Sequence, residues 1–212
     1  MGIVLECTNK DCKFRYPSEE DNLSVYYCPK CGEKALVAER INPGLITKYD
    51  SSQFSMEFNL ILVLDNIRSA YNVGSIVRTC EGLGVKHVIL CGITPTPLSS
   101  RVHKTALGAC NSVKWLYQRN GVDFIQKIRS LNYQTIALEN TRGSMNILDL
   151  KRSDLSERIS LVIGNEKTGV DPGILKISDL ILSIPMVGQK ESLNVSVAAG
   201  IATFHLIYLF RT

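Results

Sequence analysis

The sequence predicts an α/β fold of three layers, helix, sheet and helix, with a parallel sheet and a small metal-bound segment in front of it. After residue 58, short runs of leucine and β-branched residues alternate with stretches of helical periodicity. Such runs suit a parallel sheet that is covered on both faces. Before residue 32, four cysteines lie in two spaced pairs. A chain of 212 residues is long enough for one such core and a small appendage.

The small segment comes first along the chain. Its cysteines follow the spacing Cys-x4-Cys-x15-Cys-x2-Cys at Cys7, Cys12, Cys28 and Cys31. Four thiolates satisfy the tetrahedral preference of a structural zinc ion, and a segment of about 35 residues is too small to be stable without such a staple. Gly32 permits the tight turn after the second pair. We therefore predict a zinc ribbon over residues 1–40, the alternative being four unrelated reduced thiols.

Residues 41–58 have the composition of turns and linkers, so the main domain is expected over residues 59–212. Within it, strands are predicted at six apolar runs: 60–64, 85–90, 113–116, 134–138, 159–163 and 180–184. Helices are expected to fill the gaps between these strands. The remaining cysteines are expected to pack in the core, and they are Cys80, Cys91 and Cys110.

The stretch 72–83 illustrates the expected helices. Its apolar residues share one face at helical spacing, and they are Val73, Ile76, Val77, Cys80 and Leu83. Asn72 is a candidate cap for the start of this helix, and Arg78 is a candidate surface charge that pairs with Glu81. The last apolar run, about 195–210, is predicted to be a buried helix, because it is shorter than the roughly 20 residues that cross a bilayer.

Composition and charge narrow the possible functions. With 45% hydrophobic and 21% charged residues, the chain is neither disordered nor fibrous. The first residues lack the features of an export signal, so seven cysteines favour a reducing compartment, the cytoplasm. Of the 24 basic and 20 acidic residues, 6 and 7 lie in residues 1–40, which leaves 18 and 13 in residues 41–212. That basic excess suits an anionic partner such as RNA, with neither DNA nor a membrane expected.

Several familiar catalytic patterns are absent from the sequence. It has no Gly-x-Gly-x-x-Gly after a strand, no Gly-x4-Gly-Lys-Ser/Thr and no His-Glu-x-x-His. The three histidines, His87, His103 and His205, stand in no nucleophile or acid–base setting. A Rossmann dehydrogenase, a P-loop enzyme and a hydrolytic triad are therefore not predicted.

Two turns follow predicted strands at the edge where open α/β sheets place their ligands. They are Gly164-Asn165-Glu166-Lys167-Thr168-Gly169 and Pro185-Met186-Val187-Gly188. Their glycines allow a ligand to approach the backbone closely, although ordinary turns have such glycines too. The polar cluster at 191–194 opens the last helix, where Ser192 is a candidate N-cap.

The order of these pieces is more informative than any one of them. Asn72-x5-Arg78-Thr79 comes first, then the turn 164–169, then Ile184-Pro185-Met186, and last Ser192-Leu193-Asn194-Val195-Ser196-Val197-Ala198. In this order they resemble the three motifs of the SpoU, or TrmH-like, branch of the SPOUT methyltransferases, over about residues 59–210. The segment Lys104-Thr105-Ala106-Leu107-Gly108-Ala109 is similar to a further region of that family.

This resemblance implies an S-adenosylmethionine-dependent RNA methyltransferase that forms a homodimer and has a deep trefoil knot near its C-terminus. The methyl donor is then expected in the knot, with contacts from Gly164, Ile184, Met186 and Leu193 and with Leu138 to Thr141 as a further wall. The positions that match the family's catalytic or site-building residues are Asn72, Arg78, Glu166, Ser192 and Asn194.

The reaction implied is attack of a ribose 2′-hydroxyl of tRNA or rRNA on the sulfonium methyl group. In this family the arginine is often assigned the role of base, but a guanidinium stays protonated in nearly all protein settings. We therefore expect Arg78 to anchor a phosphate and to stabilise the developing alkoxide. Two alternatives stay open, namely an RNA-binding or assembly protein on an inactive scaffold and a methyltransferase that acts on a base. The zinc ribbon either contacts RNA or is purely structural.

Overall fold

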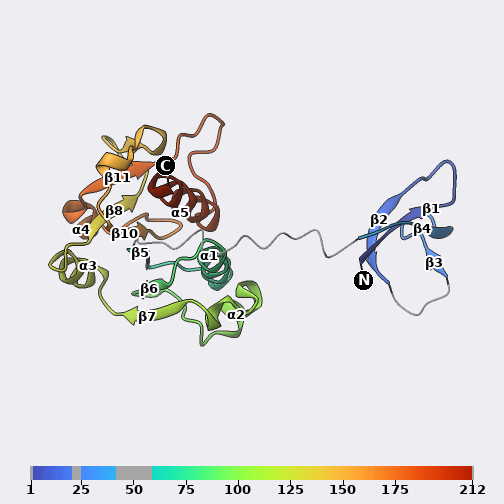
Figure 1. The fold of residues 1–212 in the computed structure, drawn as a ribbon, viewed down its shortest axis with the longest axis horizontal. Coiled ribbons are helices and arrows are strands. Elements are labelled where there is room, and N and C mark those ends of the chain that lie inside the picture. Colours follow the sequence, from blue (N-terminus) through green and yellow to red (C-terminus); the bar gives the residue numbers. More distant parts are fainter. Residues whose placement is uncertain (1, 21–24, 42–58, 212) are drawn as a thin grey trace. The chain divides into compact units, whose positions relative to one another are not determined.

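The computed structural model of the protein describes residues 2–20, 25–41 and 59–211. The chain forms two compact units, Met1–Ser55 and Met56–Thr212 (Figure 1). The zinc ribbon predicted over residues 1–40 falls in the first unit, and the main domain predicted over residues 59–212 falls in the second. The predicted linker 41–58 lies, except for residue 41, outside the described residues.

The first unit is a four-stranded antiparallel sheet. Its strands are β1 (Gly2–Cys7), β2 (Arg15–Glu19), β3 (Tyr26–Tyr27) and β4 (Lys34–Arg40), in the order β2-β1-β4-β3. Burial alternates along β1, which places Ile3 and Leu5 against Ala35 of β4. In the described part of this unit, these three residues are the buried members of the apolar cluster. So small a core needs a further cross-link to be stable.

The second unit contains a seven-stranded parallel sheet. Its strands are β5 (Asn59–Asp65), β6 (His87–Cys91), β7 (Lys114–Gln118), β8 (Gln134–Leu138), β9 (Met145–Asn146), β10 (Arg158–Ile163) and β11 (Leu180–Ser183). Their order is β7-β6-β5-β10-β8-β11-β9, and each pair of neighbours is parallel. The parallel sheet and its six predicted strands are confirmed. The strand β9 has only two residues, too few for a periodic pattern to predict it.

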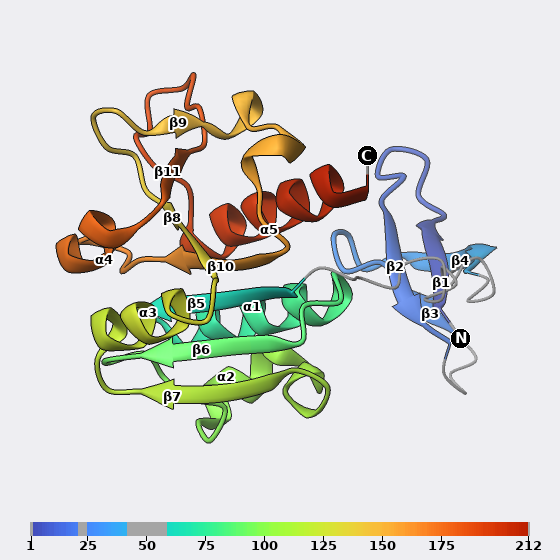
Figure 2. The same ribbon diagram turned by 60° about the vertical axis from the view of Figure 1, so that its left-hand side comes forward.

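Helices cover both faces of this sheet (Figures 1 and 2). On one side lie α1 (Ala70–Gly82), α2 (Ser100–Ala106) and α5 (Val195–Arg211), which share a large apolar core with Leu62 and Leu161. On the other side, α3 (Gly121–Arg129) and α4 (Pro172–Ile177) pack around Val63 and Val162. Short 3₁₀ helices span Ala109–Asn111, Ile147–Asp149 and Arg152–Asp154. The predicted three-layer α/β/α architecture is confirmed.

The starts of two helices differ from the predicted N-caps. Ser69 caps α1, because its hydroxyl accepts the N–H of Asn72 at 3.3 Å. Asn72 is thus not the cap, and its own side chain is free for other contacts. At α5, Asn194 rather than Ser192 has the capping role, since Asn194 Oδ1 accepts the N–H of Ser196 at 2.9 Å.

The helix α5 is apolar around much of its circumference but is only partly buried. Its buried side includes Ala199, Ala202 and Leu206. The prediction of a buried helix was wrong for the opposite side, where the side chains at positions 197, 201, 204 and 208 are exposed. Within the described residues, no helix is both long and apolar enough to cross a membrane.

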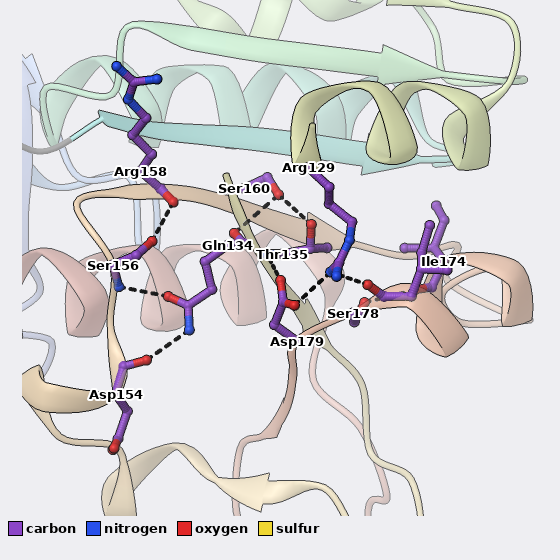
Figure 3. A network of polar contacts seen from close by, with 11 residues as sticks. Arg129, Gln134, Thr135, Asp154, Ser156, Arg158, Ser160, Ile174, Ser178 and Asp179 are labelled. Atoms are coloured by element: carbon purple, nitrogen blue, oxygen red, sulfur yellow. Dashed lines mark hydrogen bonds and ion pairs between the residues drawn. The ribbon is translucent and has the colours of Figure 1, made fainter. Parts of the chain in front are cut away.

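Polar contacts tie together the amino ends of β8, β10 and β11 (Figure 3). The carboxylate of Asp179 pairs with the Arg129 guanidinium at 2.7 Å and accepts the N–H of Thr135 at 2.7 Å. Arg129 also donates to the carbonyl of Ile177. The hydroxyl of Ser160 donates to that of Thr135 at 3.1 Å. This edge is opposite the carboxyl ends of the strands, so the network stabilises the sheet at a distance from any ligand there.

Replacing Asp179 with Ala should lower the free energy of unfolding by about 1–2 kcal/mol, because the Thr135 N–H loses its acceptor and the Arg129 guanidinium loses its ion-pair partner. Urea unfolding measures this change. Asp179→Asn retains an acceptor oxygen and should lose less. An alanine variant as stable as the wild type would contradict the role of this network.

Candidate active site

A pocket of about 400 Å³ lies at the carboxyl edge of the parallel sheet. Its walls come from the loops after β8, β10 and β11 and from the first turn of α5. These three strands are neighbours in the sheet, in the order β10-β8-β11, so the loops that follow them meet in space. This is the position at which open parallel sheets bind ligands.

Most of the residues predicted to contact the donor line this pocket. They are Leu138, Gly164, Ile184, Met186 and Leu193. Thr141 is not among the lining residues, and its carbonyl instead accepts the N–H and the hydroxyl of Ser144 at 3.0 and 2.9 Å. Thr141 therefore begins a turn next to the lining residue Asn140.

The turn from Gly164 to Gly169 is held by its own backbone. Asn165 and Gly169 exchange two backbone hydrogen bonds of 3.0 and 2.9 Å. A Cβ on Gly164 would lie 2.2 Å from the Val170 nitrogen, and Gly169 has a φ of +73°. The glycines expected at this turn are therefore required, one by close packing and the other by backbone conformation.

Glu166 projects from this turn and connects three segments of the chain. Its carboxylate accepts the N–H groups of Arg68 and Ser69 at 2.8 and 3.1 Å and the side-chain amide of Asn72 at 2.9 Å. Asn194 in turn donates to Asn72 Oδ1 at 3.2 Å. The start of α1, the turn after β10 and the start of α5 thus share one hydrogen-bond network beside the pocket.

The electrostatics of Glu166 follow from these donors. Burial alone would raise its pKa, but the Arg68 N–H, the Asn72 amide and the Ser69 N–H favour the charged form. The net effect lowers the pKa of Glu166 below its ordinary value. The carboxylate is therefore ionised at neutral pH and serves to fix the positions of Asn72 and the α1 start.

Two of the predicted catalytic residues stand apart from this network. Arg78 is exposed on α1, and within the described residues its side chain forms neither the expected pair with Glu81 nor any other ion pair or hydrogen bond. Its guanidinium is available to a ligand from solution. Ser192 lines the pocket and is exposed, with no hydrogen bond from the described part of the chain.

The four cysteines of the first unit form a separate cluster. Their sulfur atoms all lie within 4.8 Å of one another, with 3.4 Å between Cys7 and Cys31 and 3.8 Å between Cys12 and Cys28. Sulfur atoms bound to one tetrahedral zinc ion at about 2.3 Å are about 3.8 Å apart, so the cluster has the size that zinc requires. Backbone N–H groups of Asn9 and Lys30 point at two of the sulfurs at 3.4 Å each.

Comparison with known proteins relates this geometry to a family. A model of the SpoU rRNA Methylase family matches residues 59–204. The chain belongs to this family. It is 30% identical over 210 residues to the 23S rRNA (guanosine(2553)-2'-O)-methyltransferase RlmP of Bacillus subtilis, covering 97% of this chain and 81% of that protein. It is 32% identical over 149 residues to the tRNA (guanosine(18)-2'-O)-methyltransferase of Aquifex aeolicus, covering 69% of this chain and 67% of that one.

A solved structure supports the same conclusion for the fold. The AdoMet-bound rRNA methyltransferase from Sinorhizobium meliloti is similar with a TM-score of 0.65 and 28% identity, over 70% of this chain and 55% of that chain. The resemblance to the SPOUT methyltransferases is thereby confirmed, while the trefoil knot itself stays a prediction.

The pocket also contains charged residues that lie in the predicted segments but to which the sequence assigned no individual role. Glu139, Lys167 and Glu191 line it beside Glu166. Lys167 and Glu191 lie within or next to the motif segments, so their position there could have suggested them. Glu139 directly follows a predicted strand, and that location at the ligand-binding edge was the available sign.

Proposed function

We propose that this SpoU-family protein transfers a methyl group from S-adenosylmethionine to a ribose 2′-hydroxyl of tRNA or rRNA. The observation that carries the proposal is the network of Glu166, Asn72 and Asn194 at the mouth of a pocket of about 400 Å³. A pocket of this volume suits a nucleoside-sized ligand. The names of the RlmP and Aquifex relatives support the ribose 2′-hydroxyl as acceptor, and the AdoMet bound to the similar Sinorhizobium protein supports the donor.

The donor would be held by the apolar and backbone wall of the pocket. Leu138, Ile184 and Leu193 supply apolar surface, and Gly164 contributes to the lining without a side chain. Met186 adds a polarisable side chain, and we keep Thr141 as a more distant wall residue. S-adenosylmethionine supplies an electrophilic methyl group when it is bound.

The polar residues would orient the acceptor. Glu166 has three protein donors on its carboxylate, which suits a positioning role better than that of a proton acceptor. Asn72 and Asn194 are fixed by one another and Glu166, and Ser192 is free to bind RNA. Alignment of a nucleophile at near-attack distance supplies much of the acceleration in such reactions. Arg78 would anchor a phosphate and stabilise the alkoxide, because its guanidinium is exposed and unpaired within the described residues.

The experiment that tests this function uses purified protein, isotopically labelled S-adenosylmethionine and total RNA that lacks methylation. Digestion to nucleosides and mass spectrometry should find the label on a ribose 2′-oxygen. Label on a base would instead support the base methyltransferase. Absence of label with RNA binding retained would support the inactive scaffold.

We further propose that a structural zinc ion binds Cys7, Cys12, Cys28 and Cys31, because the sulfur spacing fits tetrahedral coordination. The cytoplasm is the compartment we propose, since thiols stay reduced there. Whether the ribbon contacts RNA can be tested by deleting residues 1–40 and measuring RNA affinity against salt, because loss of phosphate contacts would lower the salt dependence.

A homodimer is the proposed assembly, through the outer face of α5. An apolar stripe runs along this helix, formed by Val197, Ile201, Phe204 and Tyr208, which are 49%, 41%, 59% and 54% exposed. Their spacing of four, three and four residues places them on one face. Such an exposed apolar stripe suits burial against a second copy of itself.

Phe204→Glu should convert the dimer to a monomer, raising the dimer dissociation constant by at least about 100-fold because a charge would be buried in the interface. Sedimentation velocity measures this shift. Leu148→Glu is the matched control, since Leu148 is 68% exposed outside the stripe. A wild-type monomer, or equal effects of both variants, would contradict the proposed interface.

A further inference from the structure

The pocket has a strongly acidic lining. Glu139, Glu166 and Glu191 face a single basic lining residue of the described chain, Lys167. Three carboxylates and one ammonium group leave a formal charge of −2 around the pocket. The ligand of a methyltransferase changes its own charge during turnover, so the placement of these carboxylates affects donor and product differently.

Of the three carboxylates, Glu139 is the one both fixed and open to a ligand. Its Oε2 accepts the N–H of Val170 at 2.8 Å, and its Oε1 accepts the N–H of Asn140 at 3.1 Å. A carboxylate has about four acceptor sites, so each oxygen retains capacity for a ligand donor. Glu166 differs because its carboxylate serves three protein donors, and Glu191 differs because it is exposed and forms no hydrogen bond or ion pair within the described chain.

The position of Glu139 depends on Gly169. A Cβ at Gly169 would lie 2.1 Å from Glu139 Oε2, so only glycine leaves room for the carboxylate. The backbone of Glu139 is also held, since its N–H donates to the carbonyl of Leu182 at 2.9 Å. The side chain is half-buried. A fixed charge in a partly desolvated pocket acts on a ligand more strongly than a mobile surface charge.

Methyl transfer removes one positive charge from the ligand. The bond between sulfur and the methyl carbon breaks, its electron pair stays on sulfur, and the carbon bonds to the ribose oxygen as the hydroxyl proton leaves to a base. The sulfonium cation thereby becomes a neutral thioether. A nearby carboxylate attracts the donor through this extra charge and has no such attraction for the product sulfur.

We propose that Glu139 makes the pocket selective for the cationic methyl donor over the neutral product, S-adenosylhomocysteine, and so favours product release. This inference rests on the proposed function. Under this proposal Glu139 has two roles: it stabilises the turn at Gly169, and it interacts with the bound ligand.

The test is calorimetric binding of S-adenosylmethionine and S-adenosylhomocysteine to the full chain. Glu139→Gln is nearly isosteric and keeps an oxygen for the Val170 N–H, so the fold should be retained. The variant should weaken donor binding at least about five-fold, the order expected for loss of one partly screened charge interaction, while product affinity changes less than about two-fold. The ratio of the two dissociation constants is the decisive quantity, because damage to the turn alone would weaken both ligands alike.

Controls distinguish a failure of the role proposed for Glu139 from a failure of the proposed methyltransferase function. Glu81→Gln removes the same charge from the exposed surface of α1, outside the pocket lining, and should leave the ratio unchanged. Raising the ionic strength should move the wild-type ratio toward that of Glu139→Gln, which checks the idea without any variant. An unchanged ratio in Glu139→Gln, or equal weakening of both ligands, would overturn the role of Glu139. A wild-type protein that binds neither ligand would instead overturn the proposed function.

Discussion

Arg78→Ala should lose nearly all methyl transfer while its affinity for S-adenosylmethionine stays within about two-fold of the wild type. Arg78 does not line the pocket, which is why donor binding is expected to be retained. Its guanidinium is exposed and, in the described chain, unpaired, so removal leaves no buried group without a partner. A loss of about 100- to 1000-fold in kcat/KM is expected for a group that stabilises charge in the transition state.

The lysine variant distinguishes the two roles considered for this arginine. Arg78→Lys keeps a positive charge but loses the planar fork, so it should retain part of the activity if the side chain binds phosphate and the alkoxide. Single-turnover rates and donor binding, measured in parallel, separate an effect on methyl transfer from an effect on donor affinity. Lys86→Ala is the control, because Lys86 is an exposed cation. It directly precedes β6 and so lies at the amino edge of the sheet, whereas the pocket lies at the carboxyl edge. Full activity in Arg78→Ala would exclude this role.

Removal of zinc should unfold the first unit and leave the second unit folded. The first unit has an apolar cluster of Ile3, Leu5 and Ala35 as its buried members in the described chain. Burial of three such side chains cannot offset the conformational entropy lost on ordering residues 2–20 and 25–41. Structural zinc contributes on the order of 10 kcal/mol to folding in comparable sites, so its loss should be decisive.

The measurement combines metal analysis with amide NMR spectra of the full chain. One zinc ion per chain is expected, and Cys28→Ser should abolish it together with the dispersed resonances of residues 2–20 and 25–41. Cys110→Ser is the matched control, because Cys110 is a partly buried thiol outside the cluster. A cluster variant that binds no metal yet keeps the first unit folded would contradict the structural role of zinc.

Periodic features of the sequence predicted the fold well. The apolar runs of the second unit placed six strands of the sheet, and the stripe on α1 identified its buried face, including Val73, Ile76 and Val77. These predictions succeed because burial imposes a local pattern that a single segment shows by itself. The helix caps failed by two or three residues, since Ser69 and Asn72, like Ser192 and Asn194, are all suitable capping types.

For the site as well, the motifs predicted which residues lie at the pocket, but not the contacts between residues far apart in the chain. The motif residues Gly164, Glu166 and Asn194 lie at the pocket as their order in the family suggested. The contacts among them were not predictable from sequence, because the Asn72 to Glu166 bond spans 94 residues and the Asn194 to Asn72 bond spans 122. The role of Glu139 was hidden for the same reason, since its partner Val170 is 31 residues away.

The sequence by itself thus determined the family, the α/β class, the four cysteines that cluster in the first unit and the types of residue at the pocket. Those properties follow from the spacing of residues and from the periodicity of apolar positions, and both can be read from a segment without knowing which distant residues it contacts. Only the tertiary structure decided that the Glu166 carboxylate accepts three protein donors, that the Glu139 carboxylate accepts two and that the Arg78 side chain is unpaired within the described residues. These distinctions depend on hydrogen-bond donors brought together by the parallel sheet, whose order β10-β8-β11 makes neighbours of loops that are separate in the chain.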